Sequence, residues 1–209
     1  MKLPQYREYR ESGLRWLGSV PTHWKIGPLK RMLDIQNGED HKSVEQAEGV
    51  PVFGSGGPFA FASRSLYEGE SVLLGRKGTI DKPQYVTGHF WVVDTTYWSK
   101  IIPGNDGKFA YYSALTIPFD YYSTSTALPS MTKSVLGAHL VAYPPLAEQI
   151  IIAKFLDDET EKIDTLIAEQ EKLIALLQER RRALIAAAVT GQIDVRGAVP
   201  RLGIHEDLT

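Results

Sequence analysis

The stretch from Leu146 to Thr190 contains neither glycine nor proline, and it is bounded by Pro144-Pro145 before it and by Gly191 after it. Proline is tolerated at the start of a helix, and glycine commonly ends one. The stretch therefore predicts a long helix, on the order of 50–65 Å at about 1.5 Å per residue. Adjacent aspartates at positions 157 and 158 leave a second arrangement open, in which a short helix is followed by a longer one.

Apolar side chains recur every seven residues along this predicted helix. Such a pattern is typical of helices that pack lengthwise against a partner. One line, in which a glutamine interrupts the apolar residues, consists of Leu156, Ile163, Gln170, Leu177 and Leu184. A second line consists of Ile152, Leu166, Leu173 and Ala187, and it is flanked by Ile167, Ile174 and Ala188. A helical bundle within the chain is the alternative to a partner, but the sequence offers no second segment of comparable length for it.

The charges along the helix predict how a partner would be oriented. Acidic residues gather near its start, at positions 157–161, and Arg180, Arg181 and Arg182 gather near its end. Both groups suit the dipole of a single helix, which explains them without a partner. An antiparallel pair with its two-fold axis at Gln170 would also place each acidic end against the partner's arginines. We therefore expect an antiparallel coiled-coil homodimer in which the numbers of facing residues add up to 340, with the polar Gln170 fixing the register.

The composition is that of a soluble globular protein, with 43% hydrophobic and 23% charged residues. The absence of cysteine excludes disulfides and thiolate metal sites. The first residues lack the apolar core of a signal peptide, and no run reaches the roughly 20 apolar residues of a membrane span, so we expect a cytoplasmic protein with no membrane role. Residues 1–144 carry a net charge of +2 and residues 145–209 a net charge of −4. Any nucleic-acid site must therefore be a local arrangement.

The residues before the helix predict a mostly β domain, so that the whole chain belongs to the α+β class. From Val50 to Ile102, short apolar runs alternate with turn residues at roughly ten-residue spacing. Lys108 to Leu115 is expected to form a helix with Phe109, Tyr112 and Leu115 inward, and Ser134 to Tyr143 a final strand. The two tryptophans of residues 16–24 are expected to anchor a strap on the domain surface.

The sequence contains no recognisable catalytic motif. Residues 54–58, Gly-Ser-Gly-Gly-Pro, match neither the G-x-G-x-x-G fingerprint nor a phosphate loop, and there is no G-x-S-x-G elbow. The five histidines have no spacing that indicates a metal site. The glycines of residues 54–57 instead favour a tight turn or a close approach of the backbone to a ligand. We expect a chain that is not catalytic alone; the alternative is an enzyme with an unrecognised active site.

Two loops have the composition of a DNA contact. Residues 75–79, Gly-Arg-Lys-Gly-Thr, place adjacent cations between glycines, which can present arginine to a guanine edge or a phosphate. Residues 123–126, with more hydroxyls and a lysine at 130–133, offer short donors for phosphate. Each loop alone is also compatible with an ordinary polar turn. The residues expected to contact bases or phosphates are Arg64, Arg76, Lys77, Gly78, Thr79, Lys82, Ser125, Thr126 and Lys133.

Four motifs in combination resemble a known family. Residues 13–24 contain Gly-Leu-Arg-Trp-Leu-Gly-x-x-Pro-x-x-Trp, and residues 75–80 are Gly-Arg-Lys-Gly-Thr-Ile. Residues 143–149, Tyr-Pro-Pro-Leu-Ala-Glu-Gln, lead into the helix, and residues 188–194, Ala-Val-Thr-Gly-Gln-Ile-Asp, follow its end. Over nearly its whole length the chain resembles the specificity subunit of type I restriction-modification systems.

The resemblance implies a target recognition domain in residues 1–144, which recognises a DNA half-site mostly in the major groove, and a conserved spacer helix in residues 145–191. Residues 192–209, which are poor in apolar side chains, would be a tail. The resemblance also implies partners: double-stranded DNA, modification subunits and a restriction subunit. This chain would bind no cofactor itself, because S-adenosylmethionine, ATP and Mg would be used by the other subunits.

Specificity subunits of this family usually contain two recognition domains and two helices, whereas this chain has one of each. The chain is therefore expected to be either a half-subunit that works as a homodimer or part of a longer subunit. A homodimer would recognise an interrupted palindrome. Leu156 to Leu184 spans about 42 Å of helix, close to one duplex turn of roughly 34–36 Å. A protein-interaction scaffold with a coiled-coil helix and no DNA role is the alternative from another functional class.

Overall fold

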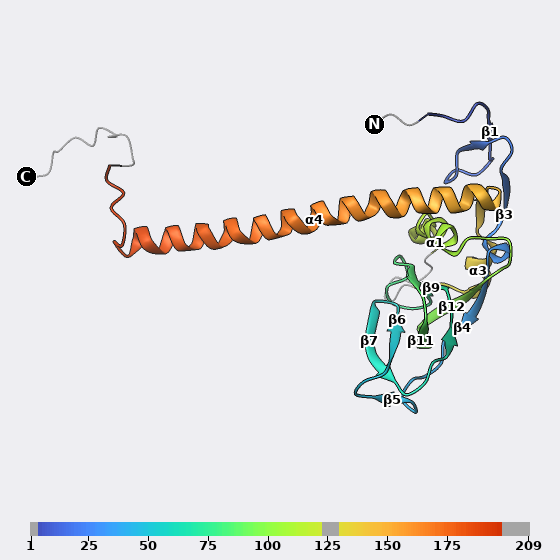
Figure 1. Cartoon of the computed structure of the whole chain (residues 1–209), viewed down its shortest axis with the longest axis horizontal. Coiled ribbons are helices and arrows are strands. Elements are labelled where there is room, and N and C mark those ends of the chain that lie inside the picture. Colours follow the sequence, from blue (N-terminus) through green and yellow to red (C-terminus); the bar gives the residue numbers. More distant parts are fainter. Residues whose placement is uncertain (1–3, 123–129, 198–209) are drawn as a thin grey trace, which may run out of the picture. The chain divides into compact units, whose positions relative to one another are not determined.

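The computed structural model describes residues 4–122 and 130–197, in which many short strands are followed by one long helix (Figure 1). The strands are β1 Tyr9–Glu11, β2 Ser19–Pro21, β3 Lys25–Pro28, β4 Leu33–Asn37, β5 Glu45–Gln46, β6 Val50–Gly54, β7 Gly57–Ala62, β8 Tyr67–Glu68, β9 Ser71–Gly75, β10 Gln84–Val86, β11 His89–Val92, β12 Thr96–Ile101 and β13 Leu140–Tyr143. The helices are the 3₁₀ turn η1 Leu29–Arg31, α1 Gly107–Leu115, α2 Phe119–Tyr122, α3 Lys133–Ala138 and α4 Leu146–Val189. The predicted α+β class is confirmed.

Two sheets form the body of the first unit. One is a four-stranded antiparallel sheet in the order β10-β9-β12-β4, and the other is a five-stranded sheet in the order β5-β7-β6-β11-β8. Within the second sheet, β11 runs parallel to β6, and the other pairs are antiparallel. The pairs β1-β2 and β13-β3 form two-stranded sheets. The β structure predicted for Val50 to Ile102 is therefore present.

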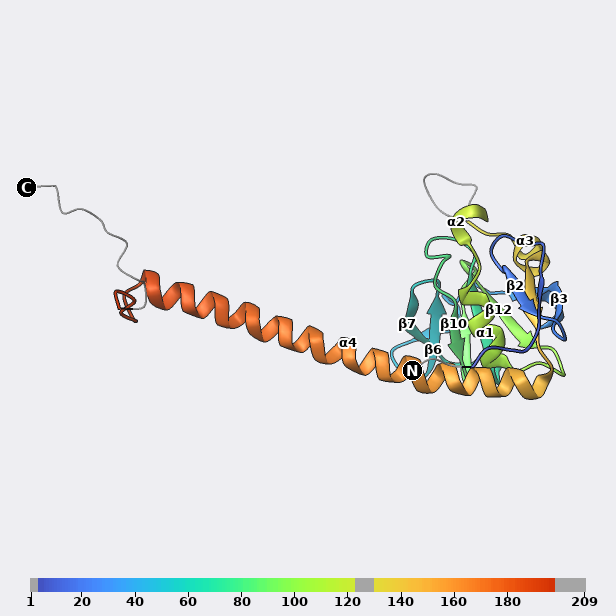
Figure 2. The same cartoon turned by 90° about the horizontal axis from the view of Figure 1, so that it is seen from above.

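The core lies on both faces of β9, which explains why that strand is buried at every position. Successive side chains of a strand point to opposite faces. Val72 and Leu74 join an apolar cluster with residues of α1, α3 and the first turns of α4, whereas Leu73 joins a second cluster that includes Phe90 and Trp98. Figure 2 shows α1 beside the first turns of α4.

Two local predictions are wrong. Residues 133–138 form α3 and not the first half of a strand, because Thr132 caps the helix by accepting a hydrogen bond from the Val135 N–H at 3.3 Å, and Leu136 is buried against the core. A short apolar run does not distinguish a strand from a buried helix turn. The strand predicted for Ser134 to Tyr143 therefore begins only at Leu140. The second wrong prediction concerns α1, in which Leu115 is 44% exposed and Ala114 is buried in its place.

The long helix is present and continuous through Asp157-Asp158, so the arrangement with two helices is excluded. It begins directly after Pro145 and ends before Gly191, which has a φ of +73°. Glycine adopts this left-handed conformation without strain, as is common after the last turn of a helix. The division into compact units, Met1–Phe155 and Leu156–Thr209, falls inside α4. Its first turns belong to the first unit because Gln149 and Ala153 are buried there.

The predicted strap is present at the surface of the first unit. The Trp16 indole N–H donates to the Leu140 carbonyl at 3.2 Å, and its ring stacks on His139 with centroids 5.3 Å apart. Trp24 binds α4, as described below. The boundaries of the functional regions, 1–144, 145–191 and 192–209, stay a prediction.

Candidate nucleic-acid interface

The cationic loop that follows β9 is held by backbone hydrogen bonds to the turn before β12. The N–H groups of Arg76 and Lys77 both donate to the Thr95 carbonyl, at 2.9 and 3.1 Å. One guanidinium nitrogen of Arg76, Nη1, donates to the Asp94 carbonyl at 3.2 Å. This bond uses one of the five N–H donors of arginine. The loop is therefore fixed in place, while the Lys77 side chain is exposed.

Glycine is required at two positions of this loop. A Cβ atom at Gly75 would lie 2.3 Å from the Thr79 carbonyl oxygen and 2.7 Å from Ile80 Cα, because the backbone turns back across β9. Gly78 has a φ of +83°, which strains residues with a side chain. A Cβ at Gly78 would be 3.3 Å from Ser55 Oγ, so the loop also lies against the turn between β6 and β7.

Residues 130–133, the part of the second predicted stretch that the structure describes, lie beside the first. Lys77 and Ser130 form an isolated antiparallel bridge, and the Met131 N–H donates to the Arg76 carbonyl at 3.0 Å. Thr132 and Lys133, both exposed, follow at once. Two loops that were ambiguous when considered separately thus combine cations and hydroxyls at one place on the unit.

A cleft of about 730 Å³ lies next to the segments that hold the loop after β9. Three segments line it, namely residues 40–42, residues 54–59 and residues 93–95. The last segment includes Asp94 and Thr95, which hold the cationic loop. Lys42 is the cation of the cleft, and Asp40 and Asp94 are its carboxylates. The glycine-rich turn was expected to allow a close approach to a ligand; sequence alone gave no signal for Thr95 or Lys42.

Of the other predicted DNA contacts, only some lie near the loop of Arg76 and Lys77. Lys82 is exposed in the same connection as Lys77. Lys133 lines a separate cleft of about 840 Å³ together with Lys30. Arg64 follows the end of β7 that is opposite the glycine-rich turn, and its guanidinium lies 5.5 Å from the centre of the Trp91 ring. The structure therefore does not bring Arg64 together with Arg76. Ser125 and Thr126 lie outside the described residues.

The predicted coiled-coil seam is solvent-exposed along the second unit. Seven of its apolar side chains have exposed fractions between 47% and 58%: Ile163, Leu166, Ile167, Leu173, Ile174, Leu177 and Leu184. Gln170 is exposed among them, and Leu156 is half-buried. Within this unit, all residues from 161 to 186 are exposed, so the helix offers a long stretch with no packing of its own.

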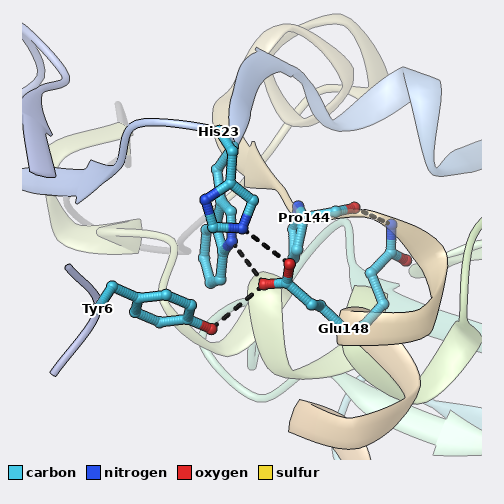
Figure 3. A network of polar contacts seen from close by, with 6 residues as sticks. Tyr6, His23, Pro144 and Glu148 are labelled. Atoms are coloured by element: carbon cyan, nitrogen blue, oxygen red, sulfur yellow. Dashed lines mark hydrogen bonds and ion pairs between the residues drawn. The ribbon is translucent and has the colours of Figure 1, made fainter. Parts of the chain in front are cut away.

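The motif at the start of α4 is attached to the N-terminal residues through Glu148 (Figure 3). One carboxylate oxygen, Oε2, accepts hydrogen bonds from the Trp24 indole N–H at 2.9 Å and from the Tyr6 hydroxyl at 3.3 Å. The other oxygen, Oε1, lies 2.8 Å from His23 Nε2. We call these four residues the Glu148 network. It joins two of the sequence motifs, the one around Trp24 and the one after Pro145.

The neighbouring Gln149 attaches the helix to the domain on its other side. Its side-chain amide is buried, donates to the Pro144 carbonyl at 2.9 Å and accepts from the Asp106 N–H at 3.0 Å. Because Asp106 caps α1, the start of α4 and the start of α1 share one polar contact. The consecutive Glu-Gln pair therefore fixes the first turn of α4 on both sides.

The Glu148 network also changes the acidity of its carboxylate. Partial burial raises the pKa of Glu148, but the hydrogen bonds from Trp24, His23 and Tyr6 and the charge of His23 together outweigh it. The pKa of Glu148 is therefore lowered below its ordinary value. The ionised form is the one that the network stabilises.

Among the described residues, no group of three or more histidines, cysteines, aspartates or glutamates could hold a metal ion. The same residues include no helix that is both long and apolar enough to cross a membrane.

Comparison with known proteins identifies relatives of the chain. Residues 21–175 match the model of a family described as the type I restriction modification DNA specificity domain. The specificity subunit of the type I restriction enzyme EcoprrI from Escherichia coli is 26% identical over 175 residues, covering 79% of this chain and 42% of the relative. The EcoBI specificity subunit from Escherichia coli is 25% identical over 203 residues, covering 90% of this chain and 43% of the relative. The chain thus spans less than half the length of these relatives.

A solved structure has a similar fold. The S subunit of a type I restriction-modification system from M. genitalium matches with a TM-score of 0.60 at 17% identity, covering 70% of this chain and 41% of that one. At this identity the similarity concerns the fold alone.

Proposed function

The chain belongs to the family of type I restriction modification DNA specificity domains, and from that premise we propose that its first unit recognises a DNA half-site. The surface that makes the contact would be the loop that follows β9, the stretch from Ser130 to Lys133 and the adjoining cleft. The chain would supply sequence recognition and no catalysis. It would act within a complex whose other subunits carry out modification and restriction.

The observation that carries this proposal is the bridge between Lys77 and Ser130. It joins two polar stretches that are far apart in the sequence and whose chemistry suits phosphates and base edges. Arginine and lysine bind guanine in the major groove, and hydroxyls and backbone N–H groups bind phosphate. A backbone fixed by the Thr95 carbonyl holds these groups before DNA arrives, so less conformational freedom is lost on binding.

We propose that α4 is the spacer and that it pairs with a second copy in antiparallel orientation. In the register in which facing residue numbers add up to 340, exposed apolar side chains face one another: Ile163 with Leu177, Leu166 with Ile174, and Ile167 with Leu173. Residues 157–161, which are mostly acidic, would face residues 179–183, which include three arginines. A seam that complements itself in one register favours a homodimer over an unrelated partner.

The assembly would include modification subunits and a restriction subunit, with S-adenosylmethionine, ATP and Mg used by those subunits. Residues 1–144 carry a net charge of only +2, so other subunits would supply most of the phosphate contacts. Binding of DNA by this chain alone should therefore be weak and should decrease strongly with salt.

The double charge reversal Arg76→Glu and Lys77→Glu tests the DNA role. Both side chains lie in the loop at the proposed interface, so we expect at least a tenfold loss of DNA affinity at low salt, since two attractive contacts become repulsive. The control is Arg7→Glu with Arg15→Glu, which changes the net charge equally at exposed positions outside that surface. Gel shift or anisotropy would measure affinity, and light scattering would measure the mass.

The outcome separates the proposed function from a protein scaffold without a DNA role. Loss of DNA binding at unchanged mass, with the control variant near wild type, supports a DNA-recognition subunit. Equal affinities for the wild-type chain and the loop variant would exclude the loop as the contact. A wild-type chain with no measurable affinity for any duplex would favour the scaffold.

A further inference from the structure

Phe59 is the aromatic side chain with the largest exposed fraction in the described part of the chain, at 59%. Single exposed apolar side chains are common on protein surfaces, so the meaning of this one depends on what surrounds it. It lies in β7, which follows the glycine-rich turn, and it lines the cleft next to the loop of Arg76 and Lys77.

A β-bulge places Phe59 in this position. In the pairing of β6 with β7, Val52 faces Ala60 and Phe53 faces Pro58, so Phe59 is the extra residue without a partner in the ladder. Such bulges change the direction of one side chain and are frequent next to functional sites. The bulge thus explains how an apolar residue in a strand comes to line an open cleft.

The Phe59 ring is held in one orientation. Its plane is nearly perpendicular to the ring of His41, with centroids 5.2 Å apart and an angle of 82°. The ring also lies close to Gly54, where an added Cβ would be only 3.4 Å from it. His41 is only 16% exposed, so it is a firm support. An ordered ring loses little freedom when a ligand contacts it.

The other groups of the cleft indicate the kind of ligand. A base edge in the major groove presents donors, acceptors and, on thymine alone, a methyl group. The cleft offers Lys42 as a donor, Asp40 and Asp94 as acceptors of amino groups, and hydroxyls at Ser55 and Thr95. Two carboxylates beside one lysine would repel a phosphate group. A phosphate would also gain little from contact with an aromatic ring.

We propose that Phe59 is a specificity-determining residue whose ring contacts the 5-methyl group of one thymine in the half-site. This inference rests on the proposed function, because it assumes that the cleft receives the base edges of DNA. A side chain that lines a recess and packs on His41 suits contact with a methyl group better than insertion between base pairs, which requires a protruding wedge. Removing one buried methyl group should reduce affinity about fourfold.

The experiment compares two randomised duplex libraries, one built with thymine and one with deoxyuridine, which lacks only the methyl group. Selections use the full chain at low salt and the variants Phe59→Ala and Phe61→Ala. Phe61 is the matched control, since it lies in the same strand and is 44% exposed, but it pairs regularly with Pro51 and does not line the cleft. Sequencing of bound duplexes gives the preference at every position.

We expect wild type and Phe61→Ala to prefer thymine over deoxyuridine about fourfold at one position, and Phe59→Ala to lose that preference while keeping the rest of the site. An unchanged preference in Phe59→Ala would overturn the inference and leave the proposed function intact. A wild-type chain that enriches no sequence would overturn both.

A second measurement does not depend on the folding of any variant. The selected duplex is made with 5-iodouracil at the preferred thymine, so that iodine replaces the methyl group, and is irradiated with the wild-type chain. A cross-link on Phe59, identified by mass spectrometry of the peptides, supports the contact. A cross-link only on another residue would overturn it.

Discussion

Single residues attach the start of α4 to the N-terminal strap, and Glu148 is the clearest case. Replacement of Glu148 by Gln keeps the shape and removes the charge that three donors share. Hydrogen bonds to a charged group contribute more than neutral ones, so we expect a loss of about 1–2 kcal/mol, seen as a melting temperature lower by several degrees. Glu169→Gln, an exposed position on the same helix, is the matched control and should melt like wild type.

The lowered pKa of Glu148 gives this prediction a pH dependence. A carboxyl group whose pKa is lower in the folded state stabilises the fold above its ordinary pKa, about 4.3, and the contribution is lost as pH falls through the folded value. Wild type should therefore lose more stability than Glu148→Gln between about pH 6 and pH 3. Parallel stability curves for the two proteins would contradict a role for the charge.

A substitution at Gly75 tests whether glycine is required there to position the cationic loop. A methyl group there would meet backbone atoms of Thr79 and Ile80, which cannot move without shifting the cationic loop. We expect Gly75→Ala to reduce stability by about 1–3 kcal/mol and to weaken DNA binding, both relative to Gly197→Ala. Gly197 has no atom within 4 Å of an added Cβ and does not line the cleft, so its replacement should be nearly neutral. Equal thermal stability and equal affinity of the two variants would argue against the steric role of Gly75.

The sequence predicted the residue types of the site better than their contacts. The motifs around Trp24 and Glu148 belong to one family pattern in the sequence, but the hydrogen bond that joins them links residues 124 positions apart. Pairing of Lys77 with Ser130 is likewise non-local. Phe59 gave no signal, because a bulge depends on the register of two strands and not on the composition of one.

At the scale of elements, α4 was the most predictable and α3 the least. A long run without glycine or proline leaves few alternatives to a helix, so even the doubtful Asp157-Asp158 pair did not interrupt it. The six residues of α3 are too few to show a period, and their helix depends on a cap from Thr132 and on burial of Leu136. Short elements are decided by their surroundings, which the sequence does not specify locally.

The proposal that the exposed apolar seam of α4 is a dimer interface can be tested by substitutions in the seam. We expect Leu166→Asp with Leu173→Asp to convert a dimer into a monomer, because the proposed pairing would have to bury four charged groups among side chains that are apolar in the wild-type chain. Light scattering over a concentration series measures the mass. The control is Ala168→Asp with Ala175→Asp, which has the same spacing and charge on the outer face of the helix and should stay dimeric. A wild-type chain that is monomeric at all concentrations would contradict the proposed antiparallel homodimer.

At the scale of the whole molecule, two features must act together. In the proposed function, the first unit would offer one small recognition surface, and the exposed apolar seam of the second unit would pair with a copy of itself around Gln170. A single half-site gives limited discrimination, because each base pair contributes only about 1–3 kcal/mol. Joining two identical surfaces through paired helices makes the second contact intramolecular, which raises affinity without any new type of contact.

The symmetry of such an assembly predicts the symmetry of its target. Two copies related by a two-fold axis must recognise two copies of one half-site in inverted orientation, separated by a constant gap. Duplexes selected from a random library by the wild-type chain should therefore contain an interrupted palindrome. The monomeric variant Leu166→Asp with Leu173→Asp should select one half of the same sequence, with lower affinity and with no constant second half. An asymmetric bipartite site selected by the wild-type chain would contradict the homodimer, because identical units cannot prefer different half-sites in one symmetric complex.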